Sequence, residues 1–424
     1  MRRNELLAGI AAATVLAHGT RACAEPLPPA QITLGNEVFL RDRRHELDGR
    51  RVGIVTNQTG VTSHLESIVD AVRRDREIAL RAVFAPEHGF RGDHPAGASV
   101  GSFLDPSTNL PVYSLYGATR RPSHAMLADV DVLLFDIQDV GSRAYTYIST
   151  LAQVMQAART TDKEVWVLDR PNPLGDLVEG PVLDPHFSSF IGLYPIAMRH
   201  GMTIGELALL FNEHFGIGCR LKVIPMEGYV NTMLWPQTGL HWVQSSPNMP
   251  QWITALFYVG TGLLDNAGVN NGIGTTLPFQ LAGASGIDAN HLAAILNARD
   301  VPGIFFRPTY WSPLFGFWLG KTLGGVELVA ADPAQARPVR AAVEILCAVR
   351  ALAPRDIVIH DSALDRDWGT DTLRTALVQG ESPDQIEERW AANTERFRRL
   401  RRPYQLYPAV APRTPAPSRN PASS

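Results

Sequence analysis

Short apolar runs recur through the first half of the chain, and segments with helical periodicity lie between them. After the first run, Leu65, Ile68, Val69 and Val72 recur at a spacing that places them on one face of a helix. Strands that are apolar along their whole length are typical of a sheet buried on both faces, and their alternation with helices indicates a parallel, doubly wound sheet. The expected strands are 51–57, 78–84, 110–115, 130–135 and 164–168.

Four of these five strands end in a cluster of polar residues. The carboxyl ends of parallel strands share one edge of a sheet, which is the usual ligand-binding edge of α/β proteins. We therefore expect one pocket at this edge. The clusters are Asn57-Gln58, Glu87-His88, Asp136 to Asp139, and Asp169 to Asn172.

The second half of the chain has a less regular pattern. Thr203 precedes a helical segment at 206–216, and Glu206 completes a capping box, so Glu206 is interpreted as structural. The segment 235–250 has no clear period and is expected to be an irregular loop, which in a compact protein is often functional. Further strands are expected at 220–226, 303–307 and 324–328, and further helices at 289–298, 333–352 and 383–402.

These patterns predict an α/β protein with a doubly wound parallel sheet in its first half, and a length of 424 residues is enough for two or three domains. Residues 409–424 are rich in Pro, Ala and Ser and are expected to be a disordered tail.

The first residues resemble a segment for export. Arg2-Arg3 precede an apolar run at 6–17, and Ala22-Cys23-Ala24 forms a cleavage site before Glu25. We therefore expect a signal peptide at 1–24 and an exported protein, periplasmic or secreted. No other run is long and apolar enough to cross a bilayer, so stable membrane insertion is not expected.

Composition and cysteine spacing exclude several classes of partner. The formal net charge of -3 provides no basic field for nucleic acid. After cleavage two cysteines remain, Cys219 and Cys347, and both two buried thiols and one disulfide fit their positions. The histidines at 88 and 94 do not have a recognised metal spacing, so a metal is not expected. The chain has neither a dinucleotide fingerprint nor a Walker A sequence, so nucleotide binding is disfavoured.

One motif suggests a different hydrolase. Gly97-Ala98-Ser99-Val100-Gly101 matches the G-x-S-x-G pattern of esterases, in which the serine is the nucleophile. That motif requires a strand directly before it, whereas the residues before Gly97 read as a loop, so an esterase is disfavoured.

Carboxylates are the strongest candidates for chemistry. Glycoside hydrolysis uses a pair of carboxyl groups, one protonated and one ionised. Glu87, Asp136, Asp139, Asp169 and Glu179 all lie at or just after strand ends. The alternative for the aspartates is that each ties loop backbone or pairs with a nearby arginine. Glu87 fits that alternative less well, because glycines keep its surroundings open.

Arginines and tyrosines follow the same strand ends. An arginine can bind a substrate anion through two parallel hydrogen bonds, and tyrosines can line a sugar site or simply pack against a helix. The candidates are Arg91, Arg143, Arg170 and Arg199, with Tyr145 and Tyr147.

Ten short motifs, in order, make the chain similar to a known family. From about Val52 to Tyr407 it resembles the NamZ-type exo-β-N-acetylmuramidases, formerly a domain of unknown function. The motifs are Thr56–Gly60, Pro86–Gly89, Leu115–Gly117, Phe135–Gly141, Tyr145–Tyr147, Leu168–Pro173, Val178–Pro181, Arg199–Thr203, Ser246–Pro250 and Arg402–Tyr404.

The resemblance implies a Rossmann-like N-terminal catalytic domain, at 25–200, and a smaller α/β auxiliary C-terminal domain, at 201–408, which completes the cleft. It implies an exo-acting glycosidase that releases non-reducing terminal N-acetylmuramic acid, or a related amino sugar, from peptidoglycan fragments without a cofactor. It implies Glu87 as the general acid/base and Glu179 as the second carboxylate, with exchangeable roles. The residues expected to bind substrate are Asn57, His88, Arg91, Asp136, Gln138, Asp139, Arg143, Tyr145, Asp169, Arg170, Asn172, Arg199, His200 and Asn248.

One segment departs from the family pattern. Relatives usually read S-E-G-R-G-T-T-R-P-F-E where this chain has residues 270–280, N-N-G-I-G-T-T-L-P-F-Q, so two arginines and two glutamates are absent. If one of those arginines binds the carboxylate of muramic acid in relatives, we expect this chain to take another amino sugar or a modified end. A non-catalytic periplasmic protein that binds muropeptides or sugars is the alternative to a glycosidase.

Overall fold

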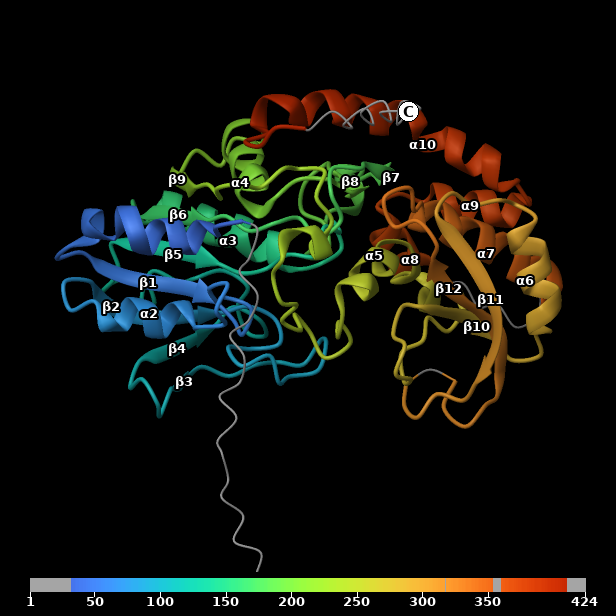
Figure 1. Ribbon diagram of the computed structural model, residues 1–424, viewed down its shortest axis with the longest axis horizontal. Helices are drawn as coiled ribbons and strands as arrows, with labels where there is room; N and C mark the ends of the chain where they lie inside the picture. Colours follow the sequence, from blue (N-terminus) through green and yellow to red (C-terminus); the bar gives the residue numbers. More distant parts are fainter. Residues whose placement is uncertain (1–31, 317, 354–359, 410–424) are drawn as a thin grey trace, which may run out of the picture.

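The computed structural model describes residues 32–316, 318–353 and 360–409 (Figure 1). The expected signal peptide lies outside the described residues, as does the expected tail apart from residue 409.

A seven-stranded sheet forms the N-terminal part of the protein (Figure 1). Its strand order is β3-β4-β2-β1-β5-β6-β9, and all its pairs are parallel except that of β3 with β4. This confirms the predicted parallel sheet. The strands are β1 (Arg51–Thr56), β2 (Ala79–Ala85), β3 (Phe103–Leu104), β4 (Pro111–Ser114), β5 (Val132–Asp136), β6 (Glu164–Leu168) and β9 (Arg220–Ile224).

The sheet is buried on both faces, as its apolar strands predict. Leu133 and Phe135 of β5 belong to one apolar cluster, with α3 (Tyr147–Thr160), while Val132 and Leu134 belong to another, with α2 (Ile68–Arg74). Successive side chains of a strand point to opposite faces, so one fully apolar strand supplies both cores.

The strand predicted at 220–226 is observed as β9 and pairs with β6. It lies beyond residue 200, so the sheet uses residues from both of the predicted domains. The division at 200 stays a prediction. Between β6 and β9 are a two-stranded ribbon, β7 (Glu179–Val182) with β8 (Ala197–Arg199), and the helix α4 (Ile204–Glu213). Thr203 and Glu206 form the predicted capping box of α4.

The helix α3 starts only at Tyr147, well after the end of β5 at Asp136. The reason is local pairing: Ser142 forms a bridge with Arg199, and the backbone N–H of Arg143 donates to the carbonyl of Met198 at 2.9 Å. These contacts extend the β7–β8 ribbon through residues 142 and 143, and only then can the chain turn into the helix.

The C-terminal part contains a three-stranded antiparallel sheet with helices (Figure 1). The strand order is β10-β12-β11. A single apolar cluster runs from β5 and α3 to residues of β12, α6 and α7, so the two parts share a core. The elements are α5 (Trp252–Thr261), β10 (Leu281–Ala284), α6 (Ala289–Asn297), β11 (Ile304–Trp311), β12 (Leu323–Ala330), α7 (Pro338–Leu352), α8 (Asp361–Trp368) and α9 (Thr372–Gln379).

The last helix, α10 (Pro383–Arg401), runs along both parts of the protein (Figure 1). Toward the C-terminal part, Asp384 pairs with Arg340 of α7 at 2.6 Å. Toward the N-terminal part, Thr394 donates to the carbonyl of Gly180 at 2.8 Å. The helix therefore holds the two parts in one arrangement.

Candidate active site

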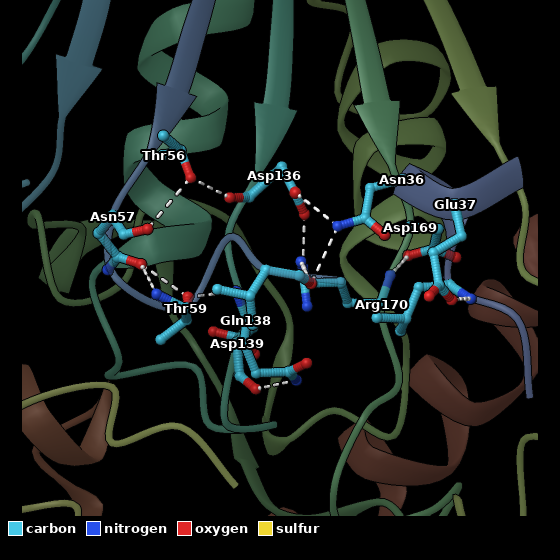
Figure 2. Close-up of polar contacts among 12 residues, drawn as sticks. Asn36, Glu37, Thr56, Asn57, Thr59, Asp136, Gln138, Asp139, Asp169 and Arg170 are labelled. Atoms are coloured by element: carbon cyan, nitrogen blue, oxygen red, sulfur yellow. Dashed lines mark hydrogen bonds and ion pairs between the residues drawn. The ribbon is translucent and has the colours of Figure 1, made fainter. Parts of the chain in front are cut away.

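The polar ends of β1, β5 and β6 lie together at one edge of the sheet, as Figure 2 shows. Asp136 forms a fully buried ion pair with Arg170, and its other oxygen accepts a 2.9 Å hydrogen bond from Asn36. Arg170 also donates to the carbonyl of Val61 at 2.6 Å. Pairing with a nearby arginine was the alternative to a catalytic role for the aspartates in the sequence analysis.

Asp169 also has its oxygens occupied inside the protein. It accepts hydrogen bonds from the backbone of Arg170 and Gly205 and from the hydroxyls of Thr203 and Tyr407, at 2.6–2.9 Å. Burial raises the pKa of Asp169 to about 6, although these hydrogen bonds favour the charged form. Asp169 therefore joins the end of β6 to the start of α4 and to the C-terminal segment.

Asp139 and His200 form a second buried pair. Asp139 Oδ2 accepts a 2.8 Å hydrogen bond from the backbone of Gly141 and lies 3.6 Å from Nε2 of His200. His200 Nδ1 accepts from the backbone of Met202 at 3.2 Å, which assigns the proton of a neutral ring to Nε2, the side that faces Asp139.

The amides at this edge support turns. Gln138 donates to the backbone carbonyls of Asp139 and Pro171 at 2.8 and 2.7 Å. Asn57 and Asn172 each accept from the backbone N–H two residues further on, at 2.9 and 3.0 Å. Such contacts are typical of Asx turns.

None of the four predicted arginines lines the large cavity described next. Arg143 and Arg199 are fully buried, and burial lowers the pKa of each to about 10. Arg143 donates to four backbone carbonyls and Arg199 to two. Arg91 points elsewhere, with its side chain 56% exposed and paired with Asp105. For these arginines and for the aspartates and amides above, contact with substrate stays a prediction.

A cavity of about 180 Å³ lies at the end of β2 and contains Glu87. It holds many times the space that one water needs, whereas the cavity beside Gln138 and Arg170 has only about 20 Å³. Four predicted site residues line it: Glu87, His88, Tyr145 and Asn248. The other lining residues are Ala96, Ala144, Thr146, Ile191, Ser246, Pro247, Met249, Tyr258, Ile273 and Phe279.

Glu87 is held by two hydrogen bonds and is 7% exposed. Its Oε1 accepts from the backbone of Gly97 at 3.0 Å, and its Oε2 accepts from the hydroxyl of Thr146 at 2.7 Å. Thr146 directly precedes α3, so the carboxylate lies near the positive end of that helix dipole. Gly97 is part of the G-x-S-x-G motif, which therefore supplies a donor to Glu87.

The backbone turns sharply directly after Glu87. His88 has a left-handed conformation, with φ of 69°, and its Nδ1 lies 2.8 Å from the carbonyl of His94. Gly89 is also left-handed, at 79°. Two successive residues with positive φ turn the chain away from the strand. A positive φ costs conformational energy in a residue other than glycine, so the surrounding contacts must hold His88 in this conformation.

The irregular loop 235–250 contributes the opposite wall. Tyr145 donates to the hydroxyl of Ser245 at 2.8 Å, and Tyr147 donates to the backbone carbonyl of Ser245. These contacts fix Ser246 and Asn248 beside the cavity. Thr146 and Tyr258 were not predicted as site residues, although Thr146 lies between Tyr145 and Tyr147 in one of the family motifs.

Glu179, the predicted second carboxylate, does not line this cavity. It lies on β7 and accepts a 2.8 Å hydrogen bond from the backbone N–H of Arg340, near the N-terminus of α7. Burial raises the pKa of Glu179, and the nearby charge of Arg199 partly opposes that shift. This position joins the β7–β8 ribbon to α7.

Another carboxyl group, which is partly buried, lies near the cavity. Asp367 lines a smaller cavity of about 60 Å³, which shares Ala144, Ile191 and Tyr258 with the first. Burial, and then the charge of Asp265, raise the pKa of Asp367 to about 7. Asp367 was not among the predicted site residues.

Among the described residues, no three His, Cys, Asp or Glu side chains form a group that could hold a metal ion. In the same residues, no helix has the length and apolar character needed to cross a membrane. Cys219 and Cys347 are both free thiols.

Comparisons with known proteins cover both parts of the chain. Residues 52–253 match the family described as exo-beta-N-acetylmuramidase NamZ, N-terminal, and residues 256–407 match its C-terminal counterpart. The peptidoglycan beta-N-acetylmuramidase NamZ of Bacillus subtilis (strain 168) is 40% identical over 379 residues, which are 89% of this chain and 92% of that protein.

Two crystal structures of DUF1343 family proteins from Bacteroides fragilis NCTC 9343 have the same fold. One is 38% identical with a TM-score of 0.84, over 90% of this chain and 100% of that chain. The other is 29% identical with a TM-score of 0.71, over 89% and 99%.

Proposed function

Because the chain belongs to the NamZ exo-β-N-acetylmuramidase family, and is therefore a glycosidase of peptidoglycan, we propose that it releases terminal N-acetylmuramic acid from the non-reducing end of peptidoglycan fragments. The observation that carries this proposal is the position of Glu87. Of the described residues that line the cavity, it is the only carboxylate, and two hydrogen bonds orient it.

Glu87 is proposed to transfer the proton. As a general acid it protonates the glycosidic oxygen while the bond to the terminal sugar breaks, and in the reverse sense it takes a proton from the attacking water. The hydrogen bonds from Gly97 and Thr146 hold both oxygens, so the carboxyl group needs little rearrangement to act.

Two residues are candidates for the second carboxyl group of the catalytic pair. Glu179 stays the sequence's prediction, but its contact with the start of α7 suits a structural role. Asp367 is the second candidate, because its cavity shares Tyr258 with that of Glu87 and its raised pKa keeps it partly protonated near neutral pH.

Export is a further part of the proposal. The apolar run at 6–17 and the cleavage site at Ala22-Cys23-Ala24 support delivery to the periplasm or the outside of the cell, where peptidoglycan is found. Sequencing the N-terminus of the protein recovered from the producing cell tests this, and a mature chain that starts at Glu25 is the expected result.

The activity is tested with 4-nitrophenyl β-N-acetylmuraminide and with defined muropeptides, with product analysis. The proposal expects release of a single terminal sugar by the wild type and loss of release in Glu87→Gln. A non-catalytic binding protein would instead bind the disaccharide in calorimetry and form no product.

A further inference from the structure

A second hollow, of about 590 Å³, lies on the same stretch of chain as part of the cavity that contains Glu87. Phe190 lines the hollow and the next residue, Ile191, lines the cavity. The hollow has two arginines, Arg120 and Arg121, and one aromatic side chain, Phe190. Its other lining residues are Gly117, Ala118, Thr119, Gln153, Ser188, Ser189 and Leu193.

Arg120 is held against aromatic rings. Its guanidinium carbon lies 4.5 Å from the ring centre of Phe190 and 5.4 Å from that of Tyr116. The two rings are themselves 5.9 Å apart. Such stacking orients the planar guanidinium and leaves its N–H edge available to an anion.

Tyr116 connects Arg120 to Glu87. Burial raises the pKa of Tyr116, and the negative charge of Glu87 raises it further, whereas the positive charge of Arg120 lowers it. Arg120 therefore lies one tyrosine away from the proposed proton-transfer residue.

Arg120 has no carboxylate partner within the described residues, since no ion pair there includes it. Arg121 differs, because it donates to Gln153 at 2.7 Å and to Gln156. A cation that is oriented but unpaired beside a reactive carboxylate is suited to bind an anion of the substrate.

We propose that Arg120 binds the free carboxylate of the lactyl group on the terminal sugar, an inference that rests on the proposed function. Muramic acid carries this carboxylate, and a cavity that contains Glu87 alone would repel it. No lysine or arginine is among the described residues that line the cavity, and Ile273 occupies a wall formed by the altered segment 270–280. Arg120, which is held against Tyr116 and Phe190, supplies the missing positive charge.

The test compares two substrates that differ only in this charge. They are 4-nitrophenyl β-N-acetylmuraminide and the same glycoside with its lactyl carboxylate converted to a carboxamide, measured at pH 7. The wild type is expected to prefer the carboxylate in kcat/KM. Arg120→Gln should reduce that preference roughly 10- to 100-fold, as the loss of charge-assisted hydrogen bonds implies, and should act mainly through KM.

Matched variants control for folding. Arg121→Gln removes a charge from the same hollow and should leave the preference unchanged, and Arg120→Lys should restore part of it. Equal losses by Arg120→Gln on both substrates would show a structural role and overturn the inference. An unchanged preference in Arg120→Gln would overturn it as well.

The outcome also separates this inference from the proposed function. If the wild type hydrolyses neither glycoside nor any defined muropeptide, the proposed function itself fails. If the wild type hydrolyses both glycosides equally, only the role of Arg120 fails. A loss confined to muropeptides with a stem peptide would assign Arg120 to a peptide carboxylate, and the lactyl assignment would be rejected.

Discussion

The hydroxyl of Thr146 lies 2.7 Å from Oε2 of Glu87 and donates a hydrogen bond to it. The two residues belong to different elements, since Glu87 follows β2 and Thr146 directly precedes α3. The contact closes the end of a strand onto the start of a helix, and it orients the carboxyl group that faces the cavity.

Thr146→Val tests this orientation. Valine has nearly the shape of threonine but cannot donate, so Glu87 keeps only the hydrogen bond from Gly97. We expect kcat on the chromogenic muraminide to fall roughly 10-fold, about the effect of one hydrogen bond to a charged group. Thr146→Ser keeps a hydroxyl and should retain most activity, and a Val variant as active as the Ser variant would refute the role.

The two glutamates should respond differently to the same change. Glu87→Gln is expected to lower kcat by about 10²- to 10⁴-fold, because the amide cannot transfer a proton. Glu179→Gln should lower it less than about 10-fold, since its oxygen accepts from Arg340 outside the cavity and the amide keeps an acceptor. The measurement is kcat of both variants, with thermal unfolding to show that each is folded. Loss of activity in a folded Glu179→Gln variant would make Glu179 the second catalytic carboxylate.

Stability is expected to fall as pH rises from about 4 to 7. Burial raises the pKa of Asp169 to about 6 and that of Glu206 to about 7, whereas in the unfolded chain they titrate near about 4. The folded state thus binds more protons in this window, so their contribution is fully present below about pH 4 and is lost through pH 6 to 7. The loss should be on the order of a few kcal/mol in total.

Urea unfolding at several pH values measures how the free energy of unfolding changes with pH. Glu206→Gln removes one of the two titrating groups and still leaves an acceptor for the capping box, so its free energy of unfolding should vary less between pH 5 and 8. If the free energy of unfolding of the variant has the same pH dependence as that of the wild type, Glu206 does not contribute to this dependence.

Arg143 should be a major determinant of stability. Its guanidinium donates to the carbonyls of Pro181 and Ile196 on one side and of Asp367 and Trp368 on the other. Arg143→Met leaves these buried carbonyls without their donors, and we expect a loss of about 3 kcal/mol or more in the free energy of unfolding.

The matched control is an arginine in a surface ion pair. Arg74, whose side chain is 68% exposed, pairs with Glu66, and Arg74→Met should change the free energy of unfolding by less than about 1 kcal/mol. Chemical denaturation of Arg143→Met and Arg74→Met measures the free energy of unfolding of each variant. A similar small change in both would mean that the contacts of Arg143 contribute little.

Much of the fold could be predicted because it depends on local patterns. The strands at β1, β2, β5 and β6 are short apolar runs, and burial on both faces follows from their having almost no polar position. Thr203 and Glu206 form the predicted capping box, because a cap requires only residues three positions apart. The place of β9 in the sheet was not predicted, because no local pattern shows which sheet a strand joins.

By itself, the sequence determined the family, most strands of the N-terminal sheet and the edge of that sheet where polar side chains gather. Only the tertiary structure decided which of those side chains meet the cavity. Asp136 turns to Arg170 inside the protein, while Glu87 faces the cavity with Thr146, far away in the chain. Arg120 gave no signal in any motif, because its significance comes from Tyr116 and Phe190 beside it. Hydrogen-bond partners and burial depend on packing between distant segments, and residue spacing does not contain that information.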